Sequence, residues 1–180
     1  MIVFRNCDRR WPFLWESSTQ PAARWHADGS GPAQYFADTP DGAWAEFLRH
    51  EEISDPIDLV GVERGLWCVD ITEDPTTVEP RLDRDTMVGD ESTYPACQAE
   101  AARLRDVGHR ALRAPSAALK PGDASGYRVE RGFRSGPPRD GLIFVYFGAR
   151  PRAVGWLVVD RGRPPAELLA RIRPMIATSE

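Results

Sequence analysis

The amino-acid sequence predicts an α+β fold built on an antiparallel or mixed β-sheet. Short segments with strand composition outnumber the amphipathic helical segments, and the two kinds do not alternate as they do in a parallel sheet. Of the 180 residues, 42% are hydrophobic and 28% are charged, and proline and glycine are spread along the chain. These values are typical of a globular chain, so we expect a single domain over residues 1–180.

Six short segments have the composition of strands, because they are apolar or β-branched and are bounded by turn-forming or charged residues. They are residues 1–4, 33–37, 66–71, 127–129, 142–147 and 153–159. Residues 6–32 show neither the strand nor the helix period and predict a long ordered loop. We expect Trp11, Phe13 and Trp15 of this loop either to pack in the core or to form a docking site for a partner.

Three segments predict helices. Thr39-Pro40-Asp41 is a typical helix start, with an N-cap threonine, a proline in the first turn and an acid at the positive end of the helix dipole, and this helix should run to about Glu52. The second helix covers residues 96–107 and stops at Gly108. Residues 74–95 are acidic and turn-rich, which indicates a surface excursion. The third helix follows Pro164-Pro165, and its apolar face comprises Leu168, Leu169, Ile172, Met175 and Ile176.

Several classes of protein are excluded by simple counts. The longest apolar runs are far shorter than the roughly 18 residues that a membrane span needs, and the first ten residues lack the long apolar region of a secretory signal. Three cysteines without CxxC spacing and three histidines without HExxH spacing argue against a disulfide framework and a metal site. We therefore expect a cytoplasmic protein with reduced thiols, no membrane contact and no metal.

The charge of the chain bears on its partners. A net charge of -4 and a pI near 5.5 argue against direct contact with nucleic acid, because phosphate binding usually leaves a basic footprint. A small anionic ligand remains compatible with this charge, since a few arginines suffice to bind it.

The candidate site lies between residues 23 and 50. Arg24, Tyr35 and Glu46 follow one another at intervals of eleven residues, which places them at a loop-to-strand junction, on a strand and within a helix. Glu46 shares its helix face with apolar neighbours, where a carboxylate is costly to bury unless it is paired, and Arg24 and Arg5 are the candidate partners. Taken singly, these residues fit equally well a structural ion pair, a sheet tyrosine and a solvated arginine, and Ser116 fits a turn serine.

Taken in order, the motifs resemble the RES-domain family, which is named for its arginine, glutamate and serine. The resemblance covers residues 2–119. Its motifs here are Ile2-Val3-Phe4-Arg5, Arg24-Trp25-His26 with Gly29 and Tyr35, the helix segment AWAEFLRH at residues 43–50, and Ala114-Pro115-Ser116. The chain departs from the family pattern where Ala22 and Ala23 replace two glycines and where His26 replaces an asparagine. It also lacks an asparagine–proline–histidine segment after Ser116.

The resemblance implies an ADP-ribosyltransferase-like fold, with a mixed or antiparallel β core and about three helices. It also implies NAD degradation by a toxin of a bacterial toxin–antitoxin pair, in which the N-glycosidic bond between nicotinamide and ribose is broken. Phosphate or water would then accept the ADP-ribosyl group, so NAD is a substrate and no cofactor or metal is needed. The implied partners are NAD and a small helix-turn-helix antitoxin.

The resemblance also suggests roles for individual residues. Glu46 would stabilise the positive charge that develops on the ribose, and Arg24 and Arg5 would bind the pyrophosphate. Tyr35 and Trp25 offer aromatic faces for the nicotinamide ring. Ser116 would hydrogen-bond a ribose or phosphate, or hold Glu46 in place. Catalysis would then involve Glu46, Arg24, Tyr35 and Ser116.

Two alternatives to NAD degradation remain open. An ADP-ribosyltransferase acting on a macromolecule would use the same residues, because transferases of this fold also rely on a glutamate. A catalytically silent module that binds NAD or regulates a partner is the other alternative, and the departures at Ala22, Ala23 and His26 motivate it.

Overall fold

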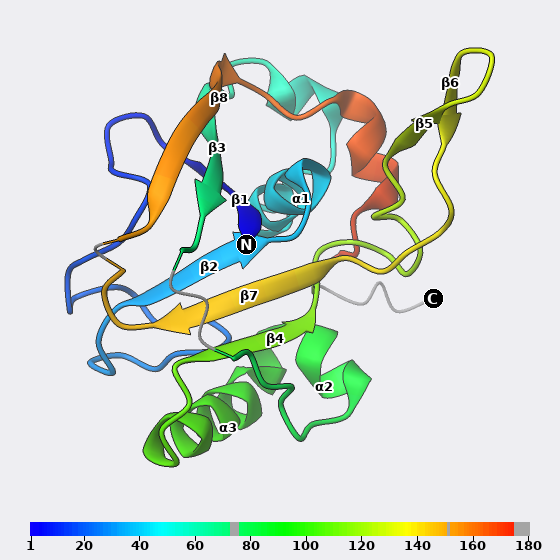
Figure 1. The fold of residues 1–180 in the computed structure, drawn as a ribbon. Helices are drawn as coiled ribbons and strands as arrows, with labels where there is room; N and C mark the ends of the chain where they lie inside the picture. Colours follow the sequence, from blue (N-terminus) through cyan, green and yellow to red (C-terminus); the bar gives the residue numbers. More distant parts are fainter. Residues whose placement is uncertain (73–75, 151, 175–180) are drawn as a thin grey trace.

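The structure, a computed structural model, describes residues 1–72, 76–150 and 152–174 (Figure 1). Six strands form one sheet in the order β4-β7-β2-β1-β3-β8, and every neighbouring pair is antiparallel. These strands are β1 (Ile2–Cys7), β2 (Ala33–Ala37), β3 (Arg64–Asp70), β4 (Ala111–Pro115), β7 (Leu142–Phe147) and β8 (Val154–Gly162). A separate hairpin is formed by β5 (Tyr127–Val129) and β6 (Phe133–Ser135). The predicted α+β class with an antiparallel sheet is confirmed.

The helices cover the sheet at two places. The α-helices are α1 (Pro40–His50), α2 (Arg84–Val88) and α3 (Tyr94–Asp106), and the 3-10 helices are η1 (Pro56–Leu59), η2 (Glu91–Thr93) and η3 (Ala166–Arg171). α1 begins as predicted, because Thr39 Oγ1 accepts a hydrogen bond of 2.9 Å from the N–H of Gly42. α3 begins two residues earlier than expected and ends before Gly108, whose φ of 90° stops the helix. No helix in these described ranges is both long and apolar enough to span a membrane.

The prediction of a long C-terminal α-helix is wrong in the described residues, which form only a short 3-10 helix. η3 ends at Arg171, and Ile172 is extended. The cause is long-range backbone pairing, since Lys120 N–H donates to the Arg171 carbonyl at 3.0 Å and Arg173 N–H donates to the Ala118 carbonyl at 2.7 Å. These bonds compete with the i to i−4 bonds of a helix. The predicted face residues Met175 and Ile176, and positions 74 and 75 of the predicted surface excursion, lie outside the described residues.

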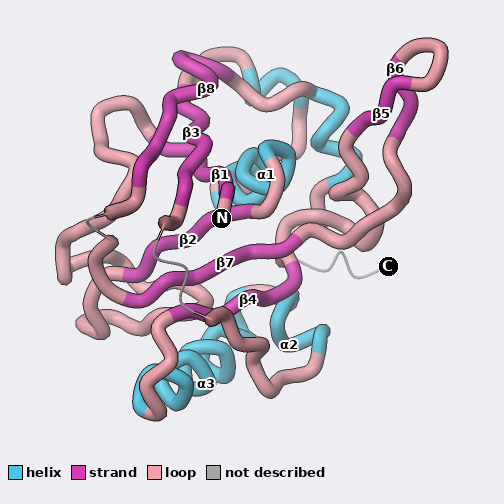
Figure 2. The backbone as a smooth tube through the Cα atoms, in the orientation of Figure 1, coloured by secondary structure: helices cyan, strands magenta, loops and turns pink. Residues whose placement is uncertain are grey.

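The sheet has two halves that separate between β1 and β2. β1 pairs with β3 over six residue pairs, whereas β1 and β2 share only the pair Phe4 and Ala37. Figure 2 shows β2, β7 and β4 running together while β3 and β8 lean away from them. A helix covers each half, with α1 beside β1 and β2 and α3 beside β4. Because neighbouring strands that diverge cannot fill the space between them with backbone hydrogen bonds, a cavity opens at this junction.

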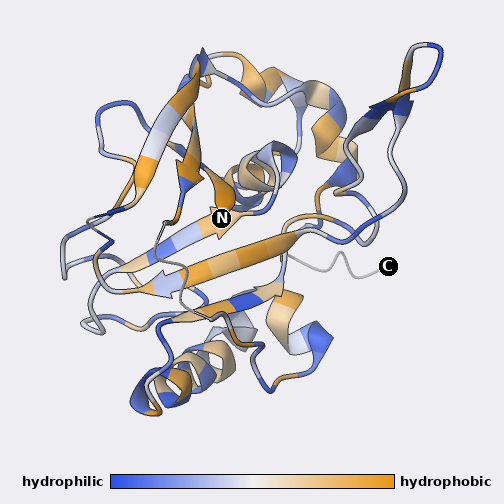
Figure 3. Cartoon of the chain, in the orientation of Figure 1, coloured by the Kyte–Doolittle hydropathy of each residue, from blue (hydrophilic) through white to orange (hydrophobic). Residues whose placement is uncertain are grey.

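Three hydrophobic clusters hold this arrangement together. One lies under α1 around Trp44 and Leu48, and another lies between α3 and the strands β4 and β7, around Trp25, Leu104 and Val145. The third lies between the sheet and the loop after β1. Figure 3 shows β7 as apolar along most of its length, with a pale blue stretch near its arrowhead, and its side chains are largely buried.

The long loop after β1 is ordered, and its aromatic residues divide between two environments. Phe13 packs on Trp67, with a ring-centroid distance of 4.9 Å. Trp11 is instead 63% exposed, and Trp15 is also exposed. Packing against the core is therefore confirmed for Phe13 and wrong for Trp11 and Trp15.

Candidate functional site

The cavity at the junction of β1, β2 and α1 has a volume of about 330 Å³. Four guanidinium groups, two carboxylates and several aromatic rings line it together. The charged members are Arg5, Arg24, Glu46, Arg49, Glu51 and Arg64, and the aromatic members are Phe4, Trp25, Tyr35, Phe36, Phe47 and Tyr94. Of the residues predicted from the sequence, all but Ser116 line this cavity.

Ser116 fixes the carboxylate of Glu46. Its Oγ donates a hydrogen bond of 2.7 Å to Glu46 Oε1 and accepts bonds from the N–H groups of Ala118 (3.2 Å) and Leu119 (3.1 Å). Because the lone pairs of Oγ are turned toward these two N–H groups, its hydrogen is directed at Glu46. Ser116 is thus both a turn serine and a residue that holds Glu46 in place. The sequence had left these two roles open as alternatives.

Opposing electrostatic effects act on the carboxyl group of Glu46. Burial raises the pKa of its carboxyl, while the Ser116 hydrogen bond and the charges of Arg49 and Arg24 act in the opposite direction. The predicted partnership with Arg24 is therefore electrostatic, and the hydrogen-bond partner is Ser116. Arg5 does not pair with Glu46, because its Nη1 donates to Gln34 Oε1 at 2.9 Å.

Arg24 and Arg49 are both anchored to the turn between α2 and η2. Arg24 donates to the Gly89 carbonyl (2.7 Å) and to Thr93 Oγ1 (2.9 Å), and its guanidinium lies 4.6 Å from the ring centroid of Tyr94. Arg49 donates to the same Gly89 carbonyl at 2.6 Å and also to the Ala117 carbonyl. One backbone turn therefore holds two cations beside Glu46, and the carbonyl oxygens fix where these cations lie.

Tyr35 is held by its hydroxyl group. The oxygen accepts a hydrogen bond of 2.9 Å from the N–H of Trp25 and lies 3.0 Å from His26 Nδ1. Burial raises the pKa of Tyr35, so its phenol stays neutral. His26, which departs from the family asparagine, is itself buried and fills this polar position. The Trp25 side chain is fully buried against α3, so it supplies packing rather than an exposed face for a ring to stack on.

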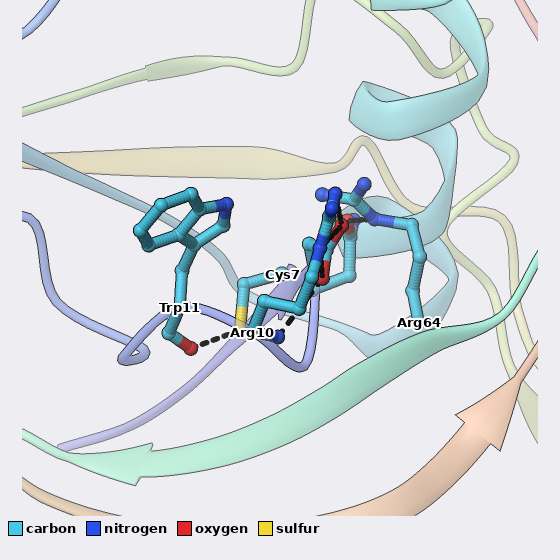
Figure 4. A network of polar contacts seen from close by, with 6 residues as sticks. Cys7, Arg10, Trp11 and Arg64 are labelled. Carbon is cyan, nitrogen blue, oxygen red and sulfur yellow. Dashed lines mark hydrogen bonds and ion pairs between the residues drawn. The ribbon is translucent and has the colours of Figure 1, made fainter.

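Arg64 completes the basic lining of the cavity. Its Nε donates to Asn6 Oδ1 at 3.0 Å, and its guanidinium lies 4.6 Å from the ring centroid of Phe47. Figure 4 shows Arg64 close to the turn after β1, where Cys7 Sγ points to the Trp11 carbonyl oxygen at 3.9 Å. Asn6 on β1 thus helps to keep Arg64 at the cavity.

Sequence reasoning did not single out Arg49, Arg64 or Tyr94. Arg49 had a usable signal, since it follows Glu46 by three residues and so shares a helix face with it. Arg64 opens a strand and Tyr94 opens a helix, and neither position distinguishes a site residue from a surface residue. Their place at the cavity follows only from the tertiary fold.

The chemistry of the cavity suits an anion that carries a planar ring. Guanidinium groups bind phosphate oxygens with paired hydrogen bonds, and the aromatic rings can contact a flat heterocycle. A half-buried carboxylate in the same cavity suits a transition state in which positive charge develops.

Comparisons with known proteins identify a family and one curated relative. A protein-family model for the RES domain matches residues 3–126. A Mycobacterium tuberculosis protein named "Probable NAD(+) phosphorylase" is 34% identical over 103 residues, which cover 53% of this chain and 48% of that protein. The chain thus matches about half the length of this curated relative.

Solved structures give a similar result for the fold. A chain from the crystal structure of the M. tuberculosis MbcT–MbcA toxin–antitoxin complex matches with a TM-score of 0.58 and 16% sequence identity. The match covers 86% of this chain and 83% of that one. Since the family model covers well over half of the 180 residues and the fold agrees, the chain belongs to the RES-domain family.

Proposed function

We propose that this chain degrades NAD by cleaving the bond between nicotinamide and ribose. The observation that carries the proposal is the half-buried Glu46 carboxylate, which Ser116 holds in a cavity that four guanidinium groups also line. Membership of the RES-domain family supports it, and so does the relative that is named as an NAD(+) phosphorylase.

The bond that breaks joins the ribose C1′ to the pyridinium nitrogen. Its electron pair moves to that nitrogen, so nicotinamide leaves as a neutral molecule and positive charge spreads over C1′ and the ring oxygen of the ribose. Ionised Glu46 stabilises this charge, while the arginines bind the pyrophosphate of NAD. An oxygen of hydrogen phosphate then forms a bond to C1′ and gives ADP-ribose 1-phosphate, or the oxygen of water does so, releases one proton to the solvent and gives ADP-ribose.

Glu46 must be ionised for this chemistry, which predicts the direction of the pH dependence. Because burial raises the pKa of its carboxyl, the group ionises at a higher pH than a solvated glutamate does. NAD cleavage should therefore increase as the pH rises through this pKa.

The direct test measures nicotinamide released from NAD by the purified protein, with and without inorganic phosphate. Glu46→Gln keeps the shape of the side chain and removes the charge, so it should reduce the release by at least 100-fold, the scale of losing one stabiliser of transition-state charge. Glu167→Gln is the matched control, since Glu167 is exposed on η3 and away from the cavity. If the wild-type protein releases no nicotinamide under either condition, the proposal fails.

The same experiment with labelled NAD separates the alternatives. Label on protein or nucleic acid would indicate an ADP-ribosyltransferase, whereas label in small molecules only would indicate degradation. A silent NAD-binding module would show a rise in melting temperature with NAD and no product.

We further propose that the chain is a cytoplasmic toxin restrained by a small helix-turn-helix antitoxin. The match to a chain of a toxin–antitoxin complex supports such a partner. The free cysteines Cys7, Cys68 and Cys97 support a reducing compartment. Expression in bacteria should arrest growth, and Glu46→Gln should abolish the arrest.

A further inference from the structure

The hairpin of β5 and β6 projects away from the body of the molecule (Figure 1). It begins just after residue 126, where the match to the RES-domain family model ends. Its apolar side chains are almost fully exposed, with exposed fractions of 73% for Tyr127, 81% for Val129 and 83% for Phe133. A two-stranded hairpin without a packed face is at best marginally stable in water, so this exposure points to a partner surface.

The strand register divides the hairpin into two faces. Val129 lies opposite Phe133 and Tyr127 lies opposite Ser135, so these side chains share one face, on which the rings of Tyr127 and Phe133 meet at 6.3 Å. Arg128 lies opposite Arg134 on the other face. Like charges directly opposite each other destabilise a hairpin unless an anion lies nearby.

The hairpin supplies only part of that negative charge. Arg128 forms an ion pair of 3.1 Å with Glu130, and both side chains are exposed. Arg134 forms no ion pair with any described residue, and Arg131 at the tip is exposed as well. We call residues 127–135 the arm. It combines an apolar face with a cationic face that is short of counter-charge.

A second exposed segment has the opposite character. Between Glu51 and Glu63 the chain has five acidic residues and no basic one, and all five are exposed. The same segment exposes 69% of Ile57 and 70% of Val60. Within the described part of the chain, none of these acids forms an ion pair. We call residues 51–63 the acidic loop; it contains η1.

We propose that the arm of one copy of this chain docks on the acidic loop of a second copy. The apolar residues of the arm would contact Ile57 and Val60, while its arginines would meet the acids around them. Each copy carries both surfaces, so the contact forms twice in a two-fold dimer, which doubles the buried area and closes the assembly. Aromatic residues and arginine are also the residue types enriched at protein interfaces.

Charge reversal on each surface provides a specific test of this dimer. The arm variant carries Arg128→Glu with Arg134→Glu, and the loop variant carries Asp58→Arg with Glu63→Arg. Sedimentation equilibrium from low micromolar to several hundred micromolar protein should show a dimer for the wild type. In each variant alone, self-association should weaken by tenfold or more. An equimolar mixture of the two variants should dimerise again, since every contact in the mixed dimer pairs opposite charges.

Two further variants control for charge and folding. Arg81→Glu with Arg110→Glu makes the same charge change at exposed arginines just before α2 and β4, away from both surfaces, and it should dimerise like the wild type. Val129→Ser with Phe133→Ser removes the apolar face of the arm without touching its charges, and it should also weaken the dimer at least tenfold. All these side chains are exposed, so the melting temperature of each variant should stay close to that of the wild type.

Several results would overturn the proposal. A wild-type protein that stays monomeric throughout the concentration range would do so, and so would variants that dimerise as tightly as the wild type. Failure of the mixture to recover would exclude arm-to-loop pairing. If the arm variant keeps the wild-type mass but loses binding to a duplex DNA probe, the arm contacts nucleic acid instead. The readout is molecular mass, so these results are independent of whether the chain cleaves NAD.

Discussion

Replacing Ser116 by alanine tests whether this residue acts through Glu46. The substitution removes the 2.7 Å hydrogen bond to Glu46 Oε1 and the two bonds that Oγ accepts from the N–H groups of Ala118 and Leu119, with little loss of volume. A hydrogen bond to a charged group contributes about 1.5–3 kcal/mol. Since 1.36 kcal/mol corresponds to a tenfold change in rate, kcat for nicotinamide release should fall by about 10- to 150-fold.

The pH profile distinguishes this role from general damage to the fold. The Ser116 hydroxyl stabilises the ionised form of Glu46 and so lowers the pKa of its carboxyl. Without that hydroxyl the pKa rises further, and the acid limb of kcat should move to higher pH. Ser116→Thr keeps a hydroxyl group and should restore much of both the rate and the profile.

The assay is nicotinamide release from saturating NAD across the neutral pH range, with the melting temperature of each variant measured in parallel. If Ser116→Ala retains the wild-type kcat and acid limb, Ser116 does not position Glu46 in the working enzyme. Loss of activity with an unshifted acid limb would also count against the reasoning, because it would separate Ser116 from the ionisation of Glu46.

Three further predictions concern stability. The pKa of Glu46 is raised in the folded state, so its ionisation lowers the stability of the fold as the pH rises through that pKa. Glu46→Gln should therefore have a higher melting temperature than the wild type above neutral pH. In acid, where Glu46 is protonated, the two melting temperatures should agree. Trp25→Ala should lower the free energy of unfolding, measured with denaturant, by about 3–5 kcal/mol, since the Trp25 side chain is fully buried. A loss below about 1 kcal/mol would show that Trp25 does not pack in the core as described. Trp11→Ala, at an exposed position, should change stability by no more than about 0.5 kcal/mol in the same assay.

Local signals were sufficient to predict the elements whose ends depend on neighbouring residues. α1 starts where Thr39 caps it and Pro40 occupies the first turn, and both features are visible in the sequence. The C-terminal helix had the right apolar spacing, but backbone pairing between residues 118–120 and 171–173 determines its actual conformation. No local pattern contains that pairing, because its two partners lie some fifty residues apart in the chain.

The candidate site shows the same limit. Glu46 and Ser116 are separated by seventy residues, and only the placement of α1 near the end of β4 brings them together. The family resemblance identified both residues because it preserves their order, whereas their spacing alone carried no such information. Helix periodicity could have identified Arg49 as a site residue, since it lies three residues beyond Glu46 on the same helix face.

The acidic, turn-rich segment before α3 has a larger role than its composition indicated. Its turn at Gly89 presents one carbonyl oxygen to both Arg24 and Arg49, and a Cβ atom at Gly89 would lie 2.5 Å from Thr93 Cγ2. Glycine therefore permits the close approach of η2 that lets this carbonyl face the two cations. Both cations favour the ionised form of Glu46 against the effect of burial. The turn thus contributes to the charge state of a carboxylate that it does not contact, through the two arginines that it holds in place.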